Sequence, residues 1–274
     1  MPDSAPISVV VPHYESPVTL GRTVDSILDQ TVLPAEIIIV DDASSAAAQR
    51  SAEHIASSIT SVECRFEVLD VNSGPGAARN AGWDLARQPI LAFIDADDSW
   101  FPRKIELQSP LLLGSGQLDG VGHPMLVAVD SVEPVGYSES GDDGSFQVVQ
   151  PRQWLWRNQF VMSSAMLRRE IPFRFRTDGR YSEDYDLWLR MAFAGHQMAI
   201  MDRPLGMHHK EIFGDSGLSA QLGAMERGEI QAYRSLYRCG SISMATFGGT
   251  AAFSLAKYLL RIARVKARRT PSQQ

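Results

Sequence analysis

Three short acidic clusters in the first hundred residues each follow an apolar run that is typical of a buried strand. They are Pro12-His-Tyr-Glu15, Asp41-Asp42 and Asp95-Ala-Asp97-Asp98. Because the carboxyl ends of parallel strands meet at one edge of a sheet, up to six carboxylates are expected in a single cleft. Carboxylates this close raise one another's pKa unless a cation neutralises them. Oxygen ligands without cysteine favour Mg²⁺ or Mn²⁺, ions that usually bind together with the phosphates of a substrate.

Each cluster also has a purely structural interpretation, because an aspartate after a strand often caps the next helix or accepts loop amides. For Asp41 and Asp42 both interpretations stay open. At Asp95, Asp97 and Asp98 a binding site is favoured, since five apolar residues deliver three acids to one strand end. The coincidence of clusters at three strand ends is stronger than any one of them.

A glycine-rich segment, Asn72-Ser-Gly-Pro-Gly-Ala-Ala-Arg-Asn-Ala-Gly82, opens an expected helix. It is not a dinucleotide-binding fingerprint, because Arg79 stands where the third glycine would be, and it lacks the Gly-Lys-Ser/Thr of a Walker loop. Two interpretations remain. Its backbone N–H groups and Arg79 approach an anion, or the segment is a tight turn that packs a helix on the sheet.

Strand and helix patterns alternate strictly through the first hundred residues. The expected strands are 7–11, 36–40, 66–69 and 90–94, and the expected helices are 18–30, 46–58 and 76–87. This alternation predicts an α/β protein with a parallel, doubly wound sheet.

Beyond residue 102 the pattern loosens but still predicts mixed structure. The expected elements are a helix to residue 113, a strand-rich segment at 121–129, a polar surface loop at 138–144, a short helix at 151–158, a strand at 160–167, an amphipathic helix at 184–194 and a last strand at 196–201. Trp154, Trp156 and Trp188 can stack on a ligand, although Trp188 fits the core better.

Five motifs together resemble the family 2 glycosyltransferases of the GT-A fold. They are Val10-Val-Pro-His-Tyr-Glu15, Ile38-Ile-Val-Asp-Asp-Ala-Ser44, Gly74-Pro-Gly-Ala-Ala-Arg-Asn-Ala-Gly82, Phe93-Ile-Asp-Ala-Asp-Asp98 and Glu183-Asp-Tyr-Asp-Leu-Trp-Leu-Arg190. Each motif is modest, but the five in this order are specific and cover roughly residues 6–215. The resemblance implies a GT-A-like (Rossmann-like), mostly parallel twisted sheet flanked by helices. It also implies a nucleotide-diphosphate sugar donor, inversion at the anomeric carbon, and Mn²⁺ or Mg²⁺.

Carried over by position, the resemblance implies roles for the residues near the nucleotide. The nucleoside pocket would be lined by Pro12, Tyr14 and Glu15. Tyr14 would stack on the base, and Asp42, with Asp41 beside it, would accept a hydrogen bond from the base. Arg79 would lie beside the nucleotide. The donor nucleotide stays open between UDP, dTDP and GDP.

The resemblance also implies a metal ligand. Asp97 and Asp98 match the family's Asp-x-Asp-type region, where Asp98 would bind the metal directly and Asp95 or Asp97 would lie nearer the ribose and sugar. The family's later histidine region is approximated by His208-His209-Lys210. Either histidine can ligate the metal or donate to the diphosphate, and the alternative is a solvated surface loop.

Asp184 aligns with the family's catalytic base. Ser182 is expected to cap the helix that follows, so that the positive end of the helix dipole keeps Glu183 and Asp184 ionised. The alternative is that these two acids only stabilise the start of the helix.

Charge is unevenly spread along the 274 residues, whose net charge is −6. Residues 231–274 hold eight Lys/Arg and no Asp or Glu, which leaves residues 1–230 with 18 basic against 32 acidic side chains. An acidic body argues against a nucleic-acid partner. Residues 253–269 mix apolar and six basic residues, as in an interfacial helix on anionic lipid. A helix packed on its own domain with a solvated basic face fits equally.

Localisation is inferred from cysteines and hydropathy. Two cysteines cannot form a disulfide framework and suit a reducing compartment. The first apolar run is too short for a signal peptide, and glycines dilute residues 239–256 too much for a membrane span. We therefore expect a cytoplasmic protein, with peripheral contact at the inner face of the membrane as an option.

Together these features predict a GT-A domain at 1–230 and a basic helical tail at 231–274. Residues 1–100 are expected to hold nucleotide and metal, and 101–230 the acceptor and the base. The expected activity is inverting transfer of a sugar to a hydroxyl of a saccharide or lipid-linked acceptor. One alternative is a sugar-phosphate nucleotidyltransferase, although residues 12–17 lack the glycines and basic group that it needs. The other is a catalytically silent nucleotide-sugar-binding module.

Overall fold

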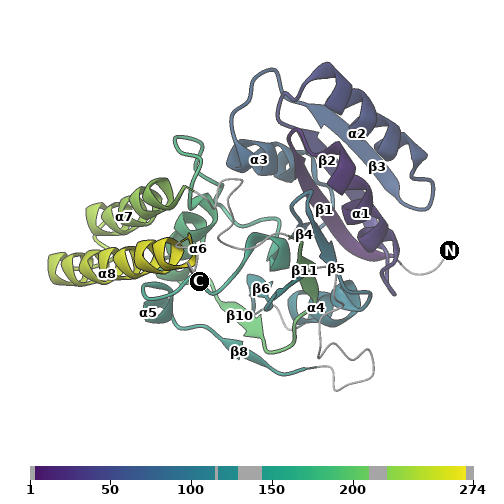
Figure 1. Cartoon of the computed structure of the whole chain (residues 1–274). Helices are drawn as coiled ribbons and strands as arrows, with labels where there is room; N and C mark the ends of the chain where they lie inside the picture. Colours follow the sequence, from purple (N-terminus) through teal and green to yellow (C-terminus); the bar gives the residue numbers. More distant parts are fainter. Residues whose placement is uncertain (1–3, 115–116, 129–143, 210–220, 270–274) are drawn as a thin grey trace, which may run out of the picture.

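The computed structural model describes residues 4–114, 117–128, 144–209 and 221–269, and of residues 263–269 it describes the helical backbone only. Most of the polar loop expected at 138–144, and Lys210, lie outside this range. A central sheet carries helices on both faces, and a hairpin of two long helices extends from one end of the molecule (Figure 1).

Eight strands form the main sheet. They are β1 (Ala5–His13), β2 (Pro34–Asp41), β3 (Glu63–Val68), β4 (Ile90–Phe93), β6 (Gly120–Gly122), β8 (Phe146–Val148), β9 (Met166–Arg168) and β10 (Met198–Met201), in the spatial order β3-β2-β1-β4-β9-β6-β10-β8. The pairs β3-β2, β2-β1, β1-β4 and β6-β10 are parallel, whereas β9 runs antiparallel to both of its neighbours and β8 to β10. The mostly parallel, doubly wound sheet is therefore confirmed, with antiparallel strands added in its second half.

Helices cover both faces of this sheet. One face holds α1 (Pro17–Leu28), α2 (Ala46–Ser58) and α4 (Lys104–Leu113), and the other holds α3 (Pro75–Leu85) and α6 (Glu183–Phe193), on which α7 (Leu222–Arg238) packs. The side chains of β1 alternate between the two cores: Val10 joins the α3 and α6 side, whereas Val9 and Val11 join the α1 side. A strand buried on both faces must be apolar throughout, which explains its continuous Val run.

A small second sheet was not expected. It pairs β5 (Asp98–Trp100) with β11 (Gly206–His208) and β11 with β7 (Leu126–Val127). The prediction that 196–201 is the last strand is wrong, because β11 follows it. These strands are only two or three residues long, so period-2 patterning has no length in which to appear. Their pairing places His208 opposite Asp98.

The strand expected at 160–167 is wrong in its first half. Residues Met162–Ser164 form a single turn of 3₁₀ helix, and only Met166–Arg168 pair as β9. The Ser164 amide and hydroxyl both bond to the carbonyl of Val161, at 2.9 and 2.7 Å. Serine hydroxyls that bond to nearby backbone compete in this way with strand pairing. The resulting turn places Ser163 at the pocket that is described below.

One buried carboxylate anchors the opposite edge of the sheet. Glu36 begins β2 with 1% of its surface exposed, and it accepts hydrogen bonds from Ser8 Oγ at 2.6 Å, from the Arg87 amide at 2.7 Å and from the Arg65 guanidinium. Although burial opposes it, these bonds hold the pKa of Glu36 below its ordinary value. The carboxylate is thus fully partnered inside the fold.

Candidate active site

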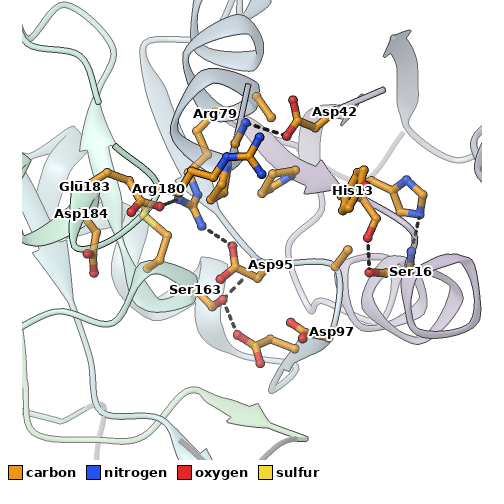
Figure 2. A pocket seen from close by; sticks show the side chains of 18 of the residues that line it. His13, Ser16, Asp42, Arg79, Asp95, Asp97, Ser163, Arg180, Glu183 and Asp184 are labelled. Carbon is orange, nitrogen blue, oxygen red and sulfur yellow. Dashed lines mark hydrogen bonds and ion pairs between the residues drawn. The ribbon is translucent and has the colours of Figure 1, made fainter. Parts of the chain in front are cut away.

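A pocket of about 580 Å³ opens where β1, β2 and β4 end. From these strand ends it is lined by Asp42, Asp95, Asp97 and Asp98. The start of α6 adds Glu183 and Asp184 on the other side, so residues more than 80 positions apart share one cavity. Figure 2 shows Glu183 and Asp184 facing His13 and Ser16 across the pocket, with Asp95 and Asp97 between them. Four of the six carboxylates expected in one cleft are therefore together.

Pro12 and Tyr14 line the pocket, and the Tyr14 side chain is half exposed. Glu15 and Asp41 do not line it. Glu15 turns away to Ser45, accepting from its amide at 2.5 Å and from its hydroxyl at 3.1 Å. Asp41 is fully buried against His13, with Oδ2 2.7 Å from Nδ1, so its carboxylate sits behind the pocket wall.

Asp42 holds the glycine-rich segment in place. Its two carboxylate oxygens accept from the amides of Ser73 and Gly74, each at 2.8 Å. Gly74 begins α3 with a φ of +89°, a left-handed conformation that glycine adopts without strain. The loop-amide role considered for the aspartate pair is thus present in the structure. Asp42 nevertheless faces the pocket, where it can meet a ligand as well.

Three residues other than glycine have left-handed backbone in the part of the chain that the structure describes, and all three flank this pocket. They are Glu15, Ala43 and Ser182, with φ of 48°, 56° and 58°. Such conformations cost energy and persist where surrounding contacts enforce them, often at functional sites. The loops after β1 and β2 and the start of α6 are therefore held in fixed shapes around the cavity.

Arg79 ties the two sides of the pocket together. From α3, its Nη2 donates to Asp95 at 2.6 Å and its Nη1 to Glu183 at 2.9 Å, and only 4% of the residue is exposed. Although burial opposes it, the charges of Asp95 and Glu183 raise the pKa of Arg79, which stays a cation. The predicted position beside a nucleotide is compatible with this placement, and the guanidinium also fixes the start of α6.

Asp98 lies in a buried polar cluster at the floor of the pocket. Its Oδ2 accepts from Ser163 Oγ, and its Oδ1 lies 2.9 Å from Nδ1 of His208. Burial raises the pKa of Asp98. For His208, burial is outweighed by the adjacent Asp98, which raises the imidazole pKa. The imidazole of His208 therefore gains its positive charge more easily beside Asp98.

The donor set here fits a divalent cation. Carboxylate oxygens from Asp98, with Asp97 beside it, and one imidazole nitrogen are suitable ligands for Mn²⁺ or Mg²⁺. Within the residues that the structure describes, no three His, Cys, Asp or Glu side chains already form a metal cage. His209 is not part of this donor set, since its Nε2 bonds to Ser99 Oγ at 2.8 Å.

The start of α6 presents two acids with different surroundings. Glu183 is buried against Arg79, whereas Asp184 is half-buried and accepts from Asn158 Nδ2 at 3.1 Å. Burial raises the pKa of both carboxyls, opposed by the Arg79 charge and, at Asp184, by the Tyr185 amide. Desolvation therefore outweighs the helix start in setting the direction of both pKa shifts.

The expected cap by Ser182 is wrong. Ser182 occupies the capping position, but its left-handed backbone turns the side chain away, and Oγ donates to the Met225 carbonyl on α7 at 3.2 Å. The hydroxyl thus joins α6 to α7 instead of satisfying the first amides of α6.

Of the three tryptophans considered for stacking, Trp154 and Trp188 are fully buried in the core and only Trp156 is exposed.

Sequence reasoning missed several residues that line the pocket or support its acids. Ser163 accepts from the Asp95 amide at 3.0 Å while donating to Asp98, so it links both ends of the acidic turn. Arg180 lines the pocket next to Gly74 and donates to the carbonyl of Asn72. No motif marks these positions, because each acts through a contact made across more than 60 residues.

Comparisons with known proteins bear on this geometry. Residues 8–123 match the family described as Glycosyl transferase family 2. The chain is 27% identical to the amylovoran biosynthesis glycosyltransferase AmsB of Erwinia amylovora, over 82% of this chain and 74% of that protein. It is 28% identical to the UDP-Glc:alpha-D-GlcNAc-diphosphoundecaprenol beta-1,3-glucosyltransferase WfgD of Escherichia coli, over 67% and 68%. The succinoglycan biosynthesis protein ExoO of Rhizobium meliloti is matched at 29% identity, over 62% of this chain and 45% of that protein.

Solved structures share the fold at low sequence identity. S. aureus TarS in complex with UDP-GlcNAc superposes with a TM-score of 0.66 at 15% identity, covering 91% of this chain and 71% of that one. The mannosyltransferase PcManGT of Pyrobaculum calidifontis, in complex with GDP-Man and Mn²⁺, gives 0.66 at 17% identity, covering 98% and 77%. The sheet and these neighbours show that the chain has a fold of the GT-A type, as the sequence predicted.

The motif order and the match over residues 8–123 narrow the class further. Residues 8–123 thus match the family that the five motifs resemble. No helix in the described residues combines the length and hydropathy needed to cross a bilayer.

Proposed function

We propose that the protein transfers a sugar from a nucleotide-diphosphate donor to an acceptor hydroxyl in one inverting displacement, with Asp184 as the base. The observation that carries this proposal is that Asp184 and Asp98 line the same pocket from opposite halves of the chain. Inversion needs the base and the departing diphosphate on opposite sides of the reacting carbon. Residues 1–100 would then hold nucleotide and metal, and residues 101–230 the acceptor and the base.

Asp184 is suited to accept the acceptor's proton. Its raised pKa makes the carboxylate more basic than an ordinary aspartate, and an effective base has a pKa close to the working pH. Asn158 donates to Oδ2 and so orients the carboxylate, which leaves Oδ1 for the hydroxyl. Arg79 holds the adjacent Glu183 and fixes the first turn of α6. Proton removal and sugar transfer then proceed in the same pocket.

The leaving group needs positive charge. Asp98, with His208 and with Asp97 beside it, would hold Mn²⁺ or Mg²⁺, and a bound ion neutralises charge that develops on the departing diphosphate. Ser163 fixes the Asp98 carboxylate from behind, and the same hydroxyl holds the Asp95 amide. The residues of this turn therefore present their oxygen atoms in one orientation before any ligand binds.

The nucleoside would lie near the ends of β1 and β2. Tyr14 is half exposed at the pocket rim, where its ring can stack on a base, and Pro12 and Asp42 complete that wall. The named neighbours are in complex with UDP-GlcNAc or GDP-Man, which supports UDP or GDP as the carrier, and dTDP stays a third candidate. The curated relatives are named for the biosynthesis of polysaccharides, and WfgD for a diphosphoundecaprenol acceptor, which supports a saccharide or lipid-linked acceptor.

A ligand screen followed by a transfer assay tests the proposal. Thermal shift with UDP-, dTDP- and GDP-sugars, each with and without Mn²⁺, should give one nucleotide whose stabilisation depends on the ion. Transfer from that donor should yield a product whose anomeric configuration, measured by NMR, is opposite to that of the donor. A product of retained configuration would refute the single displacement. Binding without turnover on any acceptor would favour the silent binding module.

A further inference from the structure

The C-terminal helix α8 (Met244–Arg269) packs on α7 through a polar face. Thr250 and Ser254 are fully buried there, and Ser254 Oγ donates to Glu229 of α7 at 2.8 Å. Lys257 Nζ and Arg261 Nη1 lie 3.4 and 3.6 Å from the same carboxylate. The first two basic residues of α8 therefore point back toward α7. The helix thus packs on its own domain, as one of the two interpretations of the sequence has it, but Lys257 and Arg261 lie against Glu229 instead of on a solvated face.

The opposite face of α8 is apolar and exposed. Its large side chains are Met244, Phe253, Leu255, Leu259 and Leu260, which we call the outer face. Leu259 and Leu260 are 64% and 61% exposed, and the smaller residues exposed between Met244 and Leu260 are only glycine and alanine. Continuous exposed apolar surface of this kind marks a binding site for a protein or a membrane.

Aromatic surface extends this face onto the neighbouring segment. The indole of Trp156, which follows α5 (Pro151–Trp154), packs edge-to-face on the ring of Phe253 at 5.2 Å, and both side chains remain exposed. Tryptophan is enriched where protein meets the polar boundary of a bilayer, because its ring is apolar and its N–H can remain hydrated.

The charge of the C-terminal segment favours a lipid surface as the binding partner of the outer face. Residues 231–274 contain eight basic and no acidic residues, and four of the basic residues come after Ile262. A second copy of α8 would bring no carboxylate to meet them, whereas anionic headgroups supply negative charge along the whole helix. Basic residues flanking exposed Leu and Phe are the pattern of a helix that lies in the membrane interface.

The helix that carries the outer face packs on α7, which contributes one residue to the pocket wall. The C-terminal half of α8 runs back along α7 (Figure 1). There Tyr258 lies beside Gly223 of α7, since its Oη would be 3.3 Å from a Cβ atom added to that glycine. Met225, two residues further along α7, lines the pocket. We propose that the outer face of α8 docks peripherally on an anionic bilayer. If the acceptor is lipid-linked, a point that rests on the proposed function, this docking presents it near the pocket.

Vesicle flotation of the full chain tests the docking. The parent protein should float with phosphatidylcholine vesicles containing about one third phosphatidylglycerol, and much less with phosphatidylcholine alone. Leu259→Glu/Leu260→Glu should lower affinity for the anionic vesicles at least about tenfold, because it places two charges where apolar area would be buried. The matched control is Val18→Glu on α1, where the side chain is 91% exposed, and it should float like the parent.

The outcomes separate docking from the proposed activity. Both variants should keep the parent's circular dichroism, melting temperature and transfer to a water-soluble acceptor, because all three positions are exposed and outside the pocket. A parent that does not float, or a double variant that floats equally well, would overturn the proposal. So would light scattering that shows a parent dimer which the double variant converts to monomer, since the outer face would then bind a second copy.

Discussion

Replacing Asp184 by asparagine removes the proposed base while keeping the shape of the side chain. The Asn158 contact can persist, since an amide oxygen still accepts from Nδ2. Loss of a positioned general base typically lowers the rate about 10²–10⁴-fold. That corresponds to about 2.7–5.5 kcal/mol of lost transition-state stabilisation. Donor binding should change little, because the carboxylates at the nucleotide end of the pocket are untouched.

The assay is steady-state transfer with the nucleotide identified by thermal shift, together with calorimetric titration of the donor. Asp84→Asn is the matched control, since Asp84 is an exposed carboxylate on α3 that pairs with Arg174 outside the pocket. It should keep the parent's kcat. Near-parental turnover of Asp184→Asn would refute the base assignment. A large loss of donor affinity in this variant would instead place Asp184 in the donor site.

The raised pKa of Asp184 adds two consequences with a definite sign. Turnover requires the ionised form, so the acid limb of the pH–rate profile should lie above the ordinary carboxyl value of 3.8. The folded state favours the neutral form of Asp184. Its contribution to the free energy of unfolding is therefore fully present below pH 3.8 and is lost as pH rises through the raised pKa. Asp184→Asn should therefore raise the melting temperature at neutral pH while activity falls, and a lower melting temperature would contradict this.

Three further predictions follow from other parts of the fold. Asp98→Ala should abolish Mn²⁺-dependent stabilisation by the donor in thermal shift, and an unchanged Mn²⁺ effect would show that the ion binds elsewhere. Gly82→Ala should lower the free energy of unfolding in urea by about 1–3 kcal/mol, because its Cβ would lie 2.4 Å from Val10 Cγ1; an unchanged midpoint would mean that the sheet yields there. The lowered pKa of Glu36 stabilises the fold at pH values above the ordinary carboxyl pKa of 4.5, and this stability is lost as pH falls through the lowered pKa. Glu36→Gln should therefore lower the free energy of unfolding at pH 7 and make that free energy less dependent on pH in the acid range. A variant whose free energy of unfolding falls with pH in parallel with the parent's would contradict this linkage.

The first half of the fold could be predicted because its signals are local. Each of the strands β1, β2 and β4 contains an apolar run, and polar residues at or just after the strand end mark the edge of the sheet. The bounds of α2 match the expected 46–58 at both ends. At its start, the side chain of Ser45 accepts a hydrogen bond from the Ala48 amide as a helix cap. Here the chain's own spacing decides the structure.

The second half and the details of the site depend on distant contacts. β11 is three residues long, and only its pairing with β5 brings His208 to Asp98. Whether Asp41 faces the pocket or His13 is decided by the direction of one side chain at a strand end, which spacing does not specify. The sign of the pKa shift at Asp184 was likewise set by burial under other elements rather than by its helix.

The bridge made by Arg79 limits how this enzyme can be recombined with its relatives. A chimera that takes the second half of the chain from another glycosyltransferase would need an acid at position 183 to meet the guanidinium, and one that changes α3 would leave Glu183 buried without a cation. A junction after residue 100 would therefore separate Arg79 and its partner Asp95 from Glu183, the second partner of Arg79 across the pocket. Exchange of acceptor preference should begin instead with loops that leave this triad intact.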